Sequence, residues 1–68
     1  MKTTAQLVGQ SIKQLREKRP WFQRDLAQAA GLPVRTIGRI ERGDVDVRLS
    51  TLTKIAKALK VTTKDLLP

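Results

Sequence analysis

Hydrophobic residues recur every three or four positions along most of this chain, which is the spacing of one face of an α-helix. Five segments carry this pattern. Their apolar positions are, in order, Leu7, Val8, Ile12 and Leu15; Leu26, Ala27 and Ala30; Ile37 and Ile40; Leu49, Leu52, Ile55, Ala56 and Leu59; and Leu66 and Leu67. The pattern predicts an all-α fold of five helices in a single domain over residues 1–68, without a repeat or a linker.

Proline and glycine mark where these helices begin and end. Pro20 stops the first helix at the residue before it, because the residue preceding a proline disfavours the helical conformation. Gly31 and Gly43 suit the left-handed position just after the second and third helices. Pro33 fits the start of the third helix, where its missing N–H would be unpaired in any case. Thr62 is the expected N-cap of the last helix.

Two residues are unfavourable where the pattern places them. Gly9 lies inside the first helix, which starts after Thr3 or Thr4, and glycine there costs about 1 kcal/mol relative to alanine. Close packing against a neighbouring element would explain it. Phe22 stands at the N-cap of the second helix and cannot accept a capping hydrogen bond. Asp25 in the first turn compensates in part through the helix dipole.

The stretch from Gln23 to Arg42 organises the chain. It consists of two short amphipathic segments that meet at Gly31, the pattern of a helix-turn-helix. On a helical wheel, the two isoleucines of the second segment share one side, and Arg35, Arg39 and Arg42 form a stripe on the other. A short helix with one buried face and one arginine-lined face suits the major groove of DNA. The alternative for such a stripe is a solvated charged surface.

The wheel also places Gly38 at the edge of the arginine face, away from the isoleucines. One interpretation is that the missing side chain lets the helix lie close to the edges of bases. The alternative is a neutral glycine with no role. A glycine at this position is expected to destabilise the helix by about 0.5–1 kcal/mol relative to alanine.

Composition narrows the class of partner. The chain has 68 residues with 14 Lys and Arg against 6 Asp and Glu, a formal net charge of +8. Such a surplus points to a polyanionic partner. No apolar run approaches the ~20 residues of a membrane span, and no helix joins a bulky aromatic face to a basic one. We therefore expect a cytoplasmic protein that binds nucleic acid rather than a membrane.

Catalysis and metal binding are not expected. The chain contains no cysteine and no histidine, which removes the usual zinc ligands and the commonest nucleophiles and bases. The six acidic residues are scattered, and no glycine-rich phosphate loop is present. We expect a non-enzyme without a cofactor.

An ordered set of short motifs resembles the Cro/C1-type (lambda-repressor-like, XRE) helix-turn-helix domain. The motifs cover roughly residues 7–67 and are GQSIKQLREKR, Gln23, Leu26-Ala27, Gly31-Leu32, Thr36-Ile37, Arg39-Ile40-Glu41-Arg42-Gly43 and LTKIAKAL from Leu52 to Leu59. The resemblance implies a compact five-helix fold with the helix-turn-helix at helices 2 and 3. It also implies binding of double-stranded DNA, as a homodimer whose recognition helices enter grooves one turn apart, about 34 Å.

Residue roles follow from the same resemblance. Arg16 and Glu41 match a family pair that joins helix 1 to the end of helix 3. Gln23 matches a residue that contacts a phosphate and supports the recognition helix. The remaining expected DNA contacts are Arg24 beside it, the recognition-helix positions Val34, Arg35, Thr36, Gly38 and Arg39, and Arg42 near the backbone.

Four residues depart from the family pattern. Phe22 and Pro33 replace small capping residues, which affects helix starts more than function. Asp44 and Asp46 put negative charge where the family's loop approaches phosphates. We therefore do not expect this loop to contact DNA.

These observations favour a sequence-specific transcriptional regulator, a repressor that acts by occupying its operator. An alternative is an antitoxin that neutralises a toxin and regulates its own promoter. A restriction-modification controller protein fits the segment VRLSTLTKIAKAL equally well. A neighbouring toxin or restriction gene would discriminate between these alternatives.

Overall fold

A computed structural model describes all residues from 1 to 68, and it contains five α-helices and no strand. The helices are α1 (Thr4–Glu17), α2 (Gln23–Ala30), α3 (Val34–Arg42), α4 (Leu49–Leu59) and α5 (Thr63–Leu66). The prediction of a five-helix all-α fold is confirmed. No helix is both long and apolar enough to cross a lipid bilayer.

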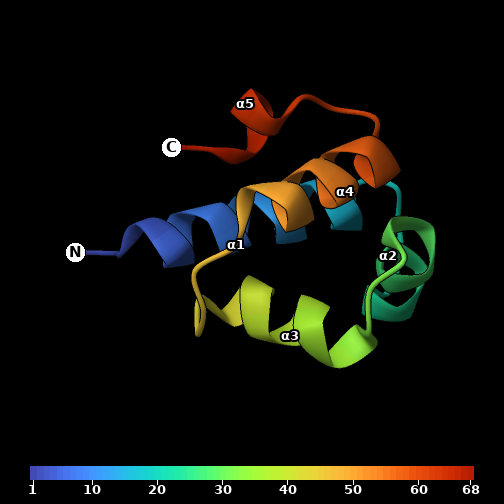
Figure 1. The fold of residues 1–68 in the computed structure, drawn as a ribbon, viewed down its shortest axis with the longest axis horizontal. Helices are drawn as coiled ribbons and strands as arrows, with labels where there is room; N and C mark the ends of the chain where they lie inside the picture. The colour runs from blue at the N-terminus through green and yellow to red at the C-terminus, as the bar shows by residue number, and fades with distance from the viewer.

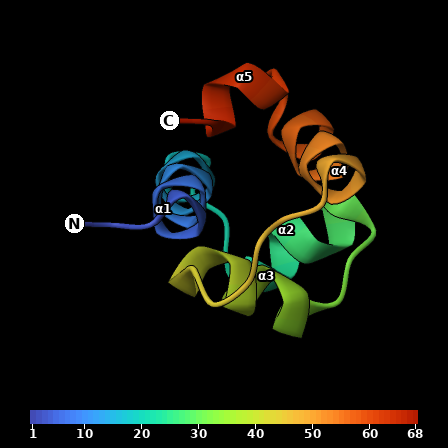
Figure 2. The same cartoon turned by 60° about the vertical axis from the view of Figure 1, so that its left-hand side comes forward.

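The helices surround one small core (Figures 1 and 2). Helix α3 packs against α1 and α2, and α4 also packs against α2. Helix α5 packs against both α1 and α4. The two chain termini lie on the same side of the molecule in both views. Helix α3 runs along the outer edge, so one of its faces is packed and the other is open to solvent.

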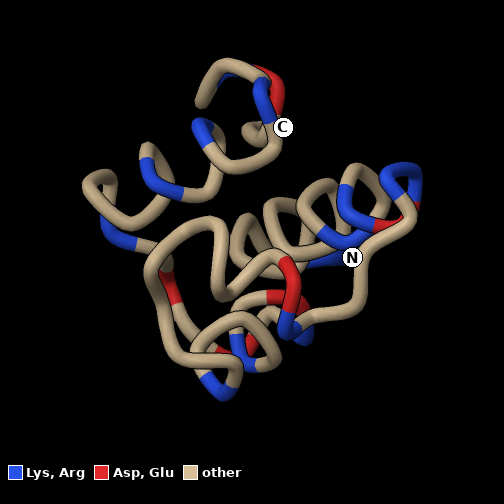
Figure 3. Tube along the Cα trace, turned by 90° about the vertical axis from the view of Figure 1, so that its right-hand side faces the viewer, with Lys and Arg blue, Asp and Glu red and all other residues tan.

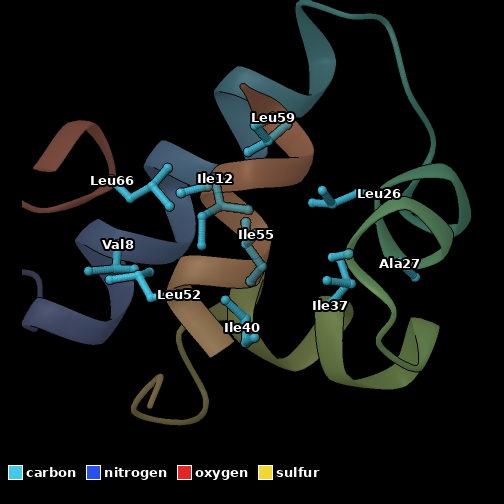
Figure 4. Packing of buried hydrophobic residues seen from close by; sticks show 12 residues of the cluster. Val8, Ile12, Leu26, Ala27, Ile37, Ile40, Leu52, Ile55, Leu59 and Leu66 are labelled. Atoms are coloured by element: carbon cyan, nitrogen blue, oxygen red, sulfur yellow. The ribbon is translucent and has the colours of Figure 1, made fainter. Parts of the chain in front are cut away.

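All five helices contribute side chains to this core (Figure 4). Its fully buried large members are Ile12, Leu26, Ile37, Ile40, Ile55 and Leu66. Three predicted core positions are wrong, because Leu7 is 36%, Leu49 72% and Leu67 48% exposed. Leu49 is the first residue of α4, and the first residue of this helix in the core is Leu52. Leu67 follows the end of α5 in an extended conformation (φ −93°, ψ 148°), which turns its side chain outward.

Side chains complete the starts of α1, α2 and α5. At α5, Asp65 Oδ2 accepts a hydrogen bond from the N–H of Thr62, the predicted N-cap, at 3.0 Å. At α1, Thr3 Oγ1 accepts a hydrogen bond from the Gln6 N–H (3.1 Å), and Gln6 Oε1 accepts one from the Thr3 N–H (2.9 Å). This reciprocal capping box satisfies two donors that the helix itself cannot. At α2, Asp25 Oδ2 accepts from the Phe22 N–H at 2.8 Å. The carboxylate thus supplies the helix start that Phe22 cannot provide.

Helix α1 and the C-terminal end of α3 meet backbone to backbone. A Cβ placed on Gly9 would stand 2.9 Å from the Glu41 carbonyl oxygen and closer still to that of Ile40. At the end of α3, Gly43 has a left-handed conformation (φ 74°), and a Cβ there would stand 2.7 Å from Gln6 Cα. The close packing expected of Gly9 is confirmed, and it fixes the position of α3.

We predict that Gly9→Ala destabilises the protein. The added methyl group must displace backbone carbonyls, which cannot rotate away, and overpacking of this kind costs about 1–3 kcal/mol. The helical gain of alanine over glycine, about 1 kcal/mol, offsets only part of this cost. Thermal unfolding followed by circular dichroism should show a Tm lower by several degrees.

Gly38→Ala is the matched control for this experiment. A Cβ on Gly38 would meet no backbone atom and only the ends of two side chains, Arg42 Nη1 at 3.3 Å and Gln23 Oε1 at 3.6 Å. The same substitution should there raise the stability by about 0.5–1 kcal/mol. Equal Tm changes in the two variants would show that the contact between α1 and α3 is not tight.

Candidate nucleic-acid interface

The turn between α2 and α3 has the geometry of a helix-turn-helix. Gly31 is left-handed (φ 69°), and the N–H of Leu32 closes the end of α2 on the Ala27 carbonyl at 2.9 Å. Pro33 then starts α3 in an extended conformation (φ −63°, ψ 144°). Glycine is favoured at the first position because it adopts positive φ without strain. The second helix of the motif is therefore held at a fixed angle to the first.

Helix α3 divides sharply into a buried and an exposed face. Ile37 and Ile40 are 0% and 1% exposed, respectively. Arg35, Arg39 and Arg42 are all exposed. At the start of the helix, Val34 is 47% exposed and Thr36 is half-buried. The face open to solvent thus presents three guanidinium groups and one apolar side chain to any partner.

A buried ion pair connects α1 to α3. Arg16 Nε donates to Glu41 Oε2 at 2.7 Å, and Arg16 Nη2 donates to Glu41 Oε1 at 2.9 Å. Arg16 Nη1 donates to the Trp21 carbonyl oxygen. The two side chains are only 9% and 3% exposed. The hydrogen bonds to Glu41 raise the pKa of Arg16, outweighing the opposite effect of burial. The structure therefore contains the two-point pair that joins helix 1 to helix 3.

The same carboxylate orients the first residue of α2. Gln23 Nε2 donates to Glu41 Oε1 at 3.0 Å, and the Gln23 side chain is half-buried. A chain of hydrogen bonds thus runs from Arg16 in the interior through Glu41 to the edge of the helix-turn-helix. The position of Gln23 depends on the packing of all three helices.

Gly38 differs from its place on the helical wheel. The wheel puts it at the edge of the arginine face, but in the structure it is buried. The side chains that cover it come from Gln23 and Arg42, which approach the position of its missing Cβ. A wheel drawn for α3 shows neither the side chain of Gln23 from α2 nor the way Arg42 lies back along its own helix, and these two side chains bury Gly38.

Further contacts of arginines and aromatics complete the surface. Arg24 is exposed, and its guanidinium lies over the Phe22 ring, 4.9 Å from the centroid. Arg19 lies over Trp21 at 4.7 Å and donates to the Leu59 carbonyl oxygen at 3.1 Å. Figure 3 shows that Lys and Arg occur on every helix. The positive charge is therefore spread over the molecule, and what distinguishes α3 is its row of arginines.

Arg42 has an acidic neighbour that the sequence analysis did not pair with it. Arg42 Nε donates to Asp44 Oδ2 at 2.9 Å, and the side chains are 63% and 55% exposed. Helical spacing could not reveal this contact, because Asp44 lies beyond the end of α3. The glycine between the two residues was the available signal, since a left-handed turn brings the chain back toward the last helical residue.

The buried polar side chains are fully occupied by hydrogen bonds within the protein. Every buried side-chain nitrogen or oxygen has a hydrogen-bond partner. No group of three or more His, Cys, Asp or Glu residues could hold a metal ion.

Comparisons with known proteins agree with this geometry. The helix-turn-helix family model HTH_3 matches residues 12–66. The HTH-type transcriptional regulator SutR of Escherichia coli is 38% identical over 61 residues, which are 90% of this chain and 34% of SutR. The chain thus spans about a third of the length of this relative.

Solved structures share the fold over nearly the whole chain. The restriction-modification controller protein C.AhdI from Aeromonas hydrophila is 32% identical, with a TM-score of 0.90 over 93% of this chain and 96% of its own. The P22 c2 repressor, solved in complex with a synthetic operator, is 29% identical, with a TM-score of 0.84 over 91% of this chain and 94% of its own. The lambda-repressor-like fold expected from the sequence is confirmed.

We predict that Glu41→Ala strongly destabilises the protein. It leaves the buried guanidinium of Arg16 without its counter-ion, which costs about 3–5 kcal/mol. A urea denaturation midpoint close to that of the parent would show that the pair does not matter for stability. The control is the double variant Arg16→Met, Glu41→Leu. It removes both charges, so its free energy of unfolding should stay much closer to that of the parent than the value for Glu41→Ala does.

Proposed function

Since the chain belongs to the HTH_3 helix-turn-helix family, we propose that it is a sequence-specific transcriptional regulator that binds double-stranded DNA. The observation that carries this proposal is the exposed arginine face of α3, on a helix whose other face is fixed against α1 and α2. The major groove admits one α-helix, and arginine is the commonest residue in base-specific contacts. A rigidly positioned, arginine-lined helix has the properties that such readout requires.

The proposed contacts fall into two groups. Val34, Arg35, Thr36 and Arg39 lie on α3 where they can face bases, and Arg35 and Arg39 suit two-point bonding to guanine. Gln23, Arg24 and Arg42 are proposed to bind phosphates and set the position of the helix on the duplex. Gly38 is assigned a different role from the one first expected. Its missing side chain makes room for Gln23 and Arg42 to lie across α3.

We propose that the protein binds as a homodimer and acts as a repressor. Two copies would place their α3 helices in successive major grooves, about 34 Å apart, on a palindromic operator. Occupying the operator would then block transcription without a further catalytic step. Because the proposed partner is duplex DNA, we place this function in the cytoplasm.

A second candidate function, which would also consist of binding duplex DNA, is that of a restriction-modification controller. C.AhdI matches this chain over nearly the full length of both proteins, at 32% identity, and this favours the controller role over the antitoxin role. A restriction gene beside this one would support it. The antitoxin alternative stays a prediction, and a neighbouring toxin gene that is lethal without this protein would support it.

We predict that the protein binds duplex DNA with steep salt dependence. Each phosphate neutralised should contribute about 0.9 to the slope of log K against log salt concentration. Selection of bound sequences from random duplex DNA, followed by affinity measurements at several salt concentrations, tests this. The selected site should be palindromic, with half-sites one helical turn apart. Binding that does not change between low and moderate salt would contradict the proposal.

We predict that two arginines of α3 have distinct roles. Arg35→Ala should cost about 1–3 kcal/mol of binding free energy and relax the preference at one base position. Arg42→Ala should weaken binding to all sequences alike, because phosphate contacts carry no sequence information. Affinities of both variants for a panel of single-base operator mutants test this. Equal, sequence-independent losses from both variants would reject base reading by Arg35.

A further inference from the structure

The ion pair at the end of α3 lies on the surface that the proposed function turns toward DNA. Arg42 Nε is 2.9 Å from Asp44 Oδ2, and both side chains are more than half exposed. Arg42 is the arginine assigned to a phosphate. In the free protein, one donor of its guanidinium is therefore already bound to an anion that the chain itself provides.

The backbone holds Asp44 beside Arg42. The left-handed Gly43 ends α3, with its N–H bonded to the Ile40 carbonyl at 3.0 Å. The N–H of Asp44 bonds to the Arg39 carbonyl, also at 3.0 Å. Gly43 is pressed against Gln6 of α1, as the crowding of its missing Cβ shows. The Asp44 carboxylate therefore approaches Arg42 from a turn that is held by both α3 and α1.

The guanidinium of Arg42 is also directed along α3. Its Nη1 lies 3.3 Å from the position that a Cβ of Gly38 would take. The group thus lies across Gly38 with Nε turned to Asp44. No further carboxylate bonds to its terminal nitrogens.

We propose that Asp44 competes with DNA phosphate for Arg42 and so lowers the affinity of the protein for DNA of any sequence. Carboxylate and phosphate oxygens satisfy a guanidinium in the same way. A phosphate that takes Arg42 must displace Asp44 and then lies beside its negative charge. Exposed ion pairs are weak, so the competition adjusts affinity without preventing binding. This inference rests on the proposed function.

The test compares four variants on random-sequence duplex DNA, which reports phosphate contacts alone. Asp44→Asn removes the charge and keeps the size of the side chain. It should tighten binding about two- to fivefold, because DNA then no longer has to break an exposed ion pair of that strength. The slope of log K against log salt should steepen by up to about 0.9, because Arg42 now neutralises a phosphate fully. Thermal unfolding checks that the fold is unchanged.

Two controls isolate the pair. Asp46→Asn makes the same charge change in the same loop, where no ion pair forms, and it should tighten binding less than Asp44→Asn. In an Arg42→Gln background, Asp44→Asn should have little effect, because the residue for which Asp44 competes is gone. A gain that depends on Arg42 in this way supports the proposal.

Three results would overturn the inference. If Asp44→Asn weakens binding, Asp44 orients Arg42 for DNA instead of competing with it. If Asp44→Asn and Asp46→Asn tighten binding equally, only the charge of the loop matters. If the gain persists in the Arg42→Gln background, Arg42 is not involved. In each case the parent protein still binds DNA, whereas failure of the proposed function would appear as a parent that does not bind at all.

Discussion

The contact between α1 and the C-terminal end of α3 is the constraint on which the rest of the structure depends. At Gly9 the two helices approach so closely that no side chain fits between them. The Arg16–Glu41 pair spans the same junction and is almost fully buried. A glycine contact tolerates little sliding, and a two-point ion pair fixes direction. Together they hold α3 at one height and one rotation, so that its arginine face is always outward.

This junction also links stability to recognition. Glu41 accepts hydrogen bonds from Arg16 and from Gln23, so a single carboxylate binds one side chain in the core and one at the edge of the proposed interface. A buried charge pair adds little to stability compared with apolar residues of the same size. Its value here is geometric, since it orients a side chain of α2 from a position on α3. The core alone, made of aliphatic side chains, could not orient an amide group.

The sequence predicted the elements well because their signals are local. Periodicity predicts five helices, and Pro20, Gly31 and Gly43 mark the ends of the first three, all without reference to the fold. The errors arose where an answer depends on a neighbour in space. Leu49 has the correct spacing but lies before the core, and Gly38 is covered by Gln23 of α2 and by Arg42 of its own helix. The motif resemblance indicated Arg16 and Glu41, yet only coordinates reveal that Glu41 also binds Gln23.

The use of acidic residues explains how a small fold keeps so much positive charge available. Four of the six acids have structural partners. Glu41 pairs with Arg16, Asp44 pairs with Arg42, and two aspartates bond to backbone N–H groups at the starts of α2 and α5. Of the fourteen cationic side chains, only two belong to ion pairs. Most of the acids thus make specific bonds within the fold, whereas most of the cations do not pair with an acid. The net charge of +8 therefore lies mainly on exposed side chains, most of which can be substituted without disturbing the junction that positions α3.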